Sequence, residues 1–202
     1  MSQLTLTSDP LGSATTGTFE FENPAFFMTG ATSQRGAVLV DQYLLQQATY
    51  TLTAGLTANT AQELFGVTTN GAVTLVAGTY EFECQFSLSS LSASSSSFGF
   101  ALGGGATFTQ YWWSLANKAA LATAANGQVT FNTAANTTLF TANSNQVAFA
   151  RIHGVVIVTV GGTLIPQVSQ SLTSVAAVVG IGSFFKIRAL GSSAATTSGN
   201  WS

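Results

Sequence analysis

The chain has 202 residues, of which 6% are charged, against about 25% in an ordinary soluble protein. Five basic residues and a net charge of −2 leave no positive surface of the kind that binds nucleic acid or an anionic membrane. The single cysteine excludes a disulfide framework. No run reaches the ~18 apolar residues of a membrane helix, so we expect no membrane insertion.

Residues 1–50 differ from the rest of the chain. They contain two of its three prolines, Pro10 and Pro24, and little regular alternation. We interpret them as an N-terminal arm with accessory strands, with a boundary near Thr49–Ala54. Residues 51–191 show a regular pattern of strands, and residues 192–202 are typical of a polar, flexible tail.

The clearest strand is Thr79–Leu88, where apolar and polar residues alternate. This period of two predicts a long strand with one buried face. The residues predicted to face the core are Tyr80, Phe82, Cys84, Phe86 and Leu88, and those predicted to face away are Glu81, Glu83, Gln85 and Ser87.

The residues from 111 to 126 carry the strongest binding signal and the least certain structure. They open with Tyr111, Trp112 and Trp113. Neighbouring residues on a strand point to opposite faces, so one tryptophan is expected to meet another subunit, a ligand or solvent. Aromatic side chains are enriched at interfaces and also suit sugar rings. The segment Ser114–Asn126 is rich in Ala and Leu, and both a short helix and an irregular loop stay open there.

Further strands are predicted at Phe98–Leu102, Val147–Ile152 and Ser183–Leu190. The apolar run Val155–Val160 is expected to be a central strand covered on both sides. In the last strand, Phe185 and Ile187 are predicted on one face, and Phe184, Lys186 and Arg188 on the other. Short strands separated by turn residues about every ten positions indicate an all-β fold, an antiparallel β-sandwich or a barrel.

Few residues could carry catalysis. We expect His153, the only histidine, to be a hydrogen-bonded structural residue, and Cys84 to be a buried, protonated thiol. Glu81 and Glu83 share a strand face about 7 Å apart, a spacing that suits a glycosidase or a calcium site as well as a solvated face. Because no metal-ligand spacing or phosphate-binding loop is present, we expect no catalytic, cofactor-binding or metal site. Glycan cleavage by the two glutamates is the rival hypothesis.

The charged residues are segregated along the chain. All seven acids lie before residue 84, and four of the five bases lie after residue 117. This is either chance among twelve residues or complementary charge across a subunit interface. Since charge normally keeps soluble proteins apart, its scarcity predicts that much of the surface is covered by copies of the chain or by a larger assembly.

Two stretches resemble parts of small tailed-bacteriophage virion proteins. The first is Leu52–Phe86, especially Asn59–Phe65 and Leu75–Phe82, and the second is Gly161–Ser171 followed by Gly182–Gly191. The hydrophobic spacing over residues 50–191 is similar to a tumour-necrosis-factor-like jelly roll, in which a terminal Phe-x-Ile-x-x-Leu strand lies near a threefold axis.

The resemblance implies a jelly-roll domain over residues 51–191 that forms a homotrimer with the help of Phe184–Leu190. Phe184, Lys186 and Arg188 therefore join Tyr111, Trp112 and Trp113 as candidate interface or ligand contacts. The implied function is that of a non-enzymatic capsid cement or decoration protein on the particle surface, whose N-terminal arm grips the major capsid protein or another virion protein. The alternative is a tail-fibre tip that recognises a host-surface glycan.

Overall fold

The computed structural model describes residues 19–22, 25–29, 35–38, 41–52, 60–66, 71–91, 96–118, 128–132, 137–142, 147–172 and 177–194. For residues 19–38, 96, 109–118, 128–132 and 137–142 within these ranges, the backbone alone is described. All regular structure in the described residues is β-strand, and each strand pair is antiparallel. No described segment forms a helix long and apolar enough to cross a membrane.

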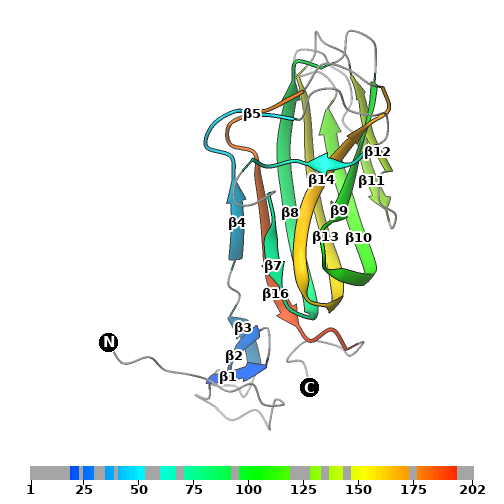
Figure 1. Ribbon diagram of the computed structural model, residues 1–202. Coiled ribbons are helices and arrows are strands. Elements are labelled where there is room, and N and C mark those ends of the chain that lie inside the picture. The colour runs from blue at the N-terminus through cyan, green and yellow to red at the C-terminus, as the bar shows by residue number, and fades with distance from the viewer. Residues whose placement is uncertain are drawn as a thin grey trace.

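An eight-stranded sheet forms the larger layer (Figure 1). Its strands are β4 (Asp41–Leu45), β5 (Tyr50–Thr51), β8 (Gly78–Ser89), β10 (Thr107–Lys118), β11 (Gln128–Asn132), β13 (Ala148–Val160), β15 (Val178–Val179) and β16 (Phe184–Gly191). The order is β11-β10-β13-β8. On the other side of β8, β16 pairs with most of its length, and β4 pairs with β16. At the C-terminal end of β8, β15 pairs with it, and β5 pairs with β15.

Two smaller sheets complete the described structure. The five-stranded sheet has the order β12-β9-β14-β6, with β7 also paired to β14. Its strands are β6 (Gln62–Glu63), β7 (Val73–Leu75), β9 (Ser96–Gly103), β12 (Thr137–Ala142) and β14 (Gly162–Gln170). The third sheet contains β1 (Phe19–Glu22), β2 (Ala25–Thr29) and β3 (Arg35–Val38), and it lies beyond the lower ends of β4 and β16 in Figure 1.

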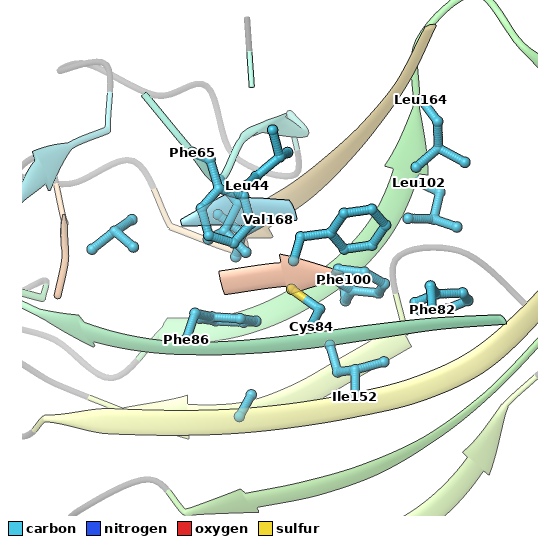
Figure 2. Close-up of a cluster of buried hydrophobic side chains, with 14 of the residues drawn as sticks. Leu44, Phe65, Phe82, Cys84, Phe86, Phe100, Leu102, Ile152, Leu164 and Val168 are labelled. Atoms are coloured by element: carbon cyan, nitrogen blue, oxygen red, sulfur yellow. The ribbon is translucent and has the colours of Figure 1, made fainter. Parts of the chain in front are cut away.

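The core lies between the eight-stranded and five-stranded sheets. Figure 2 shows side chains from both layers meeting there. The Phe82 ring, from the larger sheet, stacks on Phe100 of the smaller sheet with centroids 6.4 Å apart, and on Phe185 of β16 at 6.0 Å. Each fully buried side chain of this size contributes about 1.5–3 kcal/mol to folding, so the aromatic stack holds the two layers together.

The strand phases predicted for two segments are confirmed. In β8 the apolar face from Tyr80 to Leu88 is buried, and Glu81 and Glu83 lie on the half-buried outer face. In β16, Phe185 and Ile187 are buried, and Phe184, Lys186 and Arg188 lie on the half-buried outer face. The all-β, antiparallel character expected from the period of two is therefore correct.

The prediction that Val155–Val160 is covered on both sides is wrong. β13 is central in its sheet, between β10 and β8, but only Val156 and Val158 of the run are buried. Val155 and Ile157 are half-buried on the outer face. The five-stranded sheet covers one face of β13, so the apolar outer face is partly exposed.

The short helix and the irregular loop considered for Ser114–Asn126 are both wrong over its first five residues. Residues 114–118 belong to β10, which pairs with β13 on one side and β11 on the other. Such two-sided pairing overrides the weak preference of Ala and Leu for helix. Residues 119–126 lie outside the described residues.

The two-layer structure starts before the boundary predicted near residue 50. β4 pairs with β16 over Asp41–Leu45, and Leu44 is buried in the core. Only Leu44 of the five residues of β4 is buried. The sequence of this strand therefore shows no long alternation of apolar and polar residues. At the other end, β16 finishes at Gly191, where the strand pattern was predicted to end.

Candidate functional site

The outer face of the eight-stranded sheet carries most of the described charged side chains. They form an ion-pair ladder across three neighbouring strands, made of Glu81 and Glu83 on β8, Arg151 and His153 on β13, and Lys186 and Arg188 on β16. Two glutamates on the middle strand thus lie between positive or protonatable groups on both sides.

Register brings these residues together. Lys186 lies directly opposite Glu83 and Arg188 directly opposite Glu81. On the other side, Glu83 lies opposite His153, so each side chain of β13 reaches diagonally to its partner on β8. Diagonal neighbours in a sheet are ~7–8 Å apart, within the reach of long side chains.

Each glutamate uses its two oxygens for different strands. Glu81 Oε1 lies 2.6 Å from His153 Nε2, and Glu81 Oε2 lies 2.7 Å from Arg188 Nη2. Glu83 Oε1 lies 2.6 Å from Arg151 Nη2, and Glu83 Oε2 lies 3.2 Å from Lys186 Nζ. The carboxylates therefore tie β13 and β16 to β8.

Both glutamates have a lowered pKa. Partial burial alone would raise the pKa of Glu81, but hydrogen bonds from His153 and Arg188, together with the charge of these groups, lower it. The same balance lowers the pKa of Glu83, with Lys186 and Arg151 as the donors. Glycosidase chemistry needs one carboxyl of a pair to have a raised pKa and act as the acid. This pair instead keeps both carboxyl groups ionised, which favours a structural role.

The ladder also accounts for the segregation of charge in the sequence. Glu81 and Glu83 come from the acidic first part of the chain, and their partners come from the basic second part. Because β8 pairs with strands about 70 and 105 residues later, the two groups meet within one chain. For these residues the complementary charge lies across strand pairs of one chain. Sequence separation alone could not distinguish this arrangement from a subunit interface.

The aromatic cluster lies on β10. Tyr111, Trp112 and Trp113 pair with Val156, Val155 and Gly154 of β13 in the backbone register, and their side chains lie outside the described residues. Phe184 is half-buried on the outer face beside Leu45, and Lys186 and Arg188 belong to the ladder. The structure thus places β10 and β16 in the same sheet, with β13 and β8 between them.

Sequence reasoning missed an apolar edge on β4. Tyr43 is 59% exposed and Leu45 is 46% exposed, and both lie on the strand that pairs with β16 at one side only among the described residues. The Tyr43 hydroxyl donates a hydrogen bond to Asp41 Oδ2 at 3.1 Å. An exposed strand edge with apolar side chains is a ready surface for another chain. No period of two marks this edge in the sequence, because Tyr43, Leu44 and Leu45 are three consecutive apolar residues.

The other two residues that could carry chemistry, Cys84 and His153, make contacts that support the fold. Cys84 is fully buried, and burial raises the pKa of its thiol. His153 hydrogen-bonds Glu81, as expected of a structural histidine. Among the described residues, no group of three His, Cys, Asp or Glu side chains could hold a metal ion. Neither a family model nor a curated protein matches the chain.

Proposed function

We propose that the chain is a non-enzymatic structural protein of a bacteriophage particle, a capsid cement or decoration protein that acts as a homotrimer on the head surface. The observation that carries the proposal is the outer face of the eight-stranded sheet. The charged groups of the ladder are paired within the chain, and apolar side chains are exposed at the β4 edge. Such a face is better suited to contact with protein than to free solution.

The strand order supports a jelly-roll topology. One layer contains β4-β16-β8-β13, and the other contains β6 and β7, then β14-β9-β12. From β7 to β10 the chain changes layer at every connection, and it does so again at every connection from β11 to β15. A jelly roll is built from two such facing sheets with long connections between them. The virion-protein resemblance over residues 50–191 implies the same topology.

A threefold assembly joins two different surfaces of neighbouring copies. The apolar edge formed by Tyr43 and Leu45 is one such surface, and the outer face of the next copy, with Val155 and Ile157 half-buried, is the other. Because the ladder leaves little unpaired charge on this face, its burial needs little desolvation of isolated ions. The part of the N-terminal arm before β4 contains the three-stranded sheet and supplies the attachment to the capsid in this proposal.

Particle composition tests the proposal. The chain should be present in purified particles in a copy number that follows the symmetry of the head, and particles without it should lose their genome at lower temperature or lower salt. The chain with Tyr43→Ser and Leu45→Ser should bind to particles in fewer copies than the wild-type chain. A few copies per particle, located at the tail, would overturn the cement function in favour of a fibre tip.

A further inference from the structure

A pocket of about 190 Å³ opens on the outer face of the eight-stranded sheet, at the end of β8 and the start of β13. Gln85 and Ser87 of β8 and Phe149 of β13 line it, and the turn before β16 adds Ile181, Gly182 and Ser183. None of these residues belongs to the ion-pair ladder.

Hydrogen bonds fix the turn that forms one wall. The Gly180 amide donates to the Ser87 carbonyl at 3.1 Å, and the Gly182 amide donates to the Gln46 carbonyl at 2.9 Å. The Ser183 hydroxyl donates to the Gly180 carbonyl at 2.7 Å and accepts from the Ser87 amide at 3.3 Å. The turn is therefore attached both to β8 and to the residue that follows β4, so the pocket is formed in advance of any ligand.

The walls combine apolar and neutral polar groups. Phe149 is half-buried, and Ile181 is 67% exposed. The Gln85 amide and the Ser87 hydroxyl have no side-chain hydrogen bond within the described residues, although both can donate and accept. An aromatic ring beside free amide and hydroxyl groups can bind one apolar face and several hydroxyl groups of a ligand at once.

The lining also limits the size and charge of the ligand. Among the described side chains, none that lines the pocket is charged. Arg151, opposite Gln85, is paired with Glu83, and Lys118, opposite Phe149, is described by its backbone alone. The volume equals roughly six water molecules at ~30 Å³ each, well below the ~300 Å³ lower end of drug-sized sites. This suits one neutral six-membered ring with its substituents.

We propose that this pocket binds a single neutral sugar residue, such as the terminal unit of a glycan. The sugar ring stacks on Phe149 with Ile181 beside it, and its hydroxyl groups exchange hydrogen bonds with Gln85 and Ser87. This activity goes beyond assembly on a particle and does not depend on it. It also uses residues outside the aromatic cluster at 111–113.

Saturation-transfer NMR on the full chain tests the site. The probes are the methyl glycosides of glucose, galactose, mannose and N-acetylglucosamine, each titrated separately. At least one should receive saturation at its ring protons, with a dissociation constant on the order of millimolar, as expected for so small a ligand. Phe149→Leu keeps an apolar side chain but removes the ring, and should weaken binding at least fivefold. Gln85→Ala should do the same.

Two controls make the result decisive. Val76→Ser changes an exposed apolar residue that does not line the pocket and should leave binding unchanged. Ile181→Ser alters the most exposed wall residue, which keeps the test valid if Phe149→Leu fails to fold. The proposal is overturned if no glycoside binds, if binding survives in the Gln85→Ala and Ile181→Ser variants, or if cyclohexanol binds as tightly as the best glycoside. The last result would show selection for an apolar ring.

Discussion

Replacing Glu83 by glutamine tests the ion-pair ladder. The substitution keeps the shape of the side chain and removes its charge, so Arg151 and Lys186 lose their shared carboxylate. Glu83 is only 14% exposed, whereas Arg151 is 59% exposed. An exposed ion pair contributes ~0.2–1 kcal/mol, and hydrogen bonds to a charged group contribute more. We therefore expect Glu83→Gln to lower the free energy of unfolding by about 1–2 kcal/mol.

Thermal unfolding measures this loss. For a chain of this length, a loss of 1–2 kcal/mol lowers the Tm by roughly 3–6 °C. Glu63→Gln is the matched control, because Glu63 accepts a hydrogen bond from the Tyr50 hydroxyl at 2.8 Å and forms no ion pair within the described residues. It should lower the Tm by less than half as much. In ~1 M salt the effect of Glu83→Gln should shrink, since charges are then screened beyond ~3 Å.

The pH dependence gives the sharper result. The pKa of Glu83 is lowered in the folded chain from its ordinary value of 4.5, so its stabilisation is complete above pH 4.5 and is lost as the pH falls through the lower, folded value. The wild type and Glu83→Gln should therefore differ at pH 7 and converge in acid. An equal difference in Tm at pH 7 and well below the folded pKa would refute the reasoning, because a packing defect does not depend on the charge of the carboxyl group.

Three further predictions concern other parts of the fold. Gly71 and Gly182 both have a positive φ, but a Cβ at Gly71 would also meet a backbone carbonyl. Chemical denaturation should therefore show that Gly182→Ala lowers the free energy of unfolding by ~1 kcal/mol and Gly71→Ala by at least twice as much. Cys84 should not react with a thiol reagent at pH 8 until the chain unfolds, because burial raises its pKa; fast reaction in the folded chain would contradict its placement. Tyr43→Ser with Leu45→Ser should reduce the mass of the assembly in light scattering without changing the β-sheet circular dichroism, and an unchanged mass would exclude the β4 edge from the interface.

The strands that could be predicted from sequence are those with one buried face and one polar face. In Thr79–Leu88 and Ser183–Leu190 the alternation fixes which residues face the core, because a shift of one residue would bury charged side chains. The segment at residues 114–118 could not be assigned, because its residues favour neither helix nor strand strongly. Pairing with β11 and β13 determines its conformation, and that information lies elsewhere in the chain.

The partners across the outer face were beyond sequence reasoning for a related reason. That Glu81 faces outward follows from its own strand, but its pairing with His153 and Arg188 depends on the register of two distant strands. The pocket likewise requires the turn at Gly180–Ser183 to fold against Ser87. Long-range pairing of this kind is set by the packing of the whole sheet, so only the structure brings these residues together.

A chain with so few charged residues is expected to cover the apolar edge of its outer face with copies of itself. Sedimentation equilibrium of the purified full-length chain over a wide range of concentration tests it most directly. The chain should sediment as one species at three times the 20.8 kDa chain mass. A single-chain mass that persists at the highest concentration, with the protein still in solution, would contradict it.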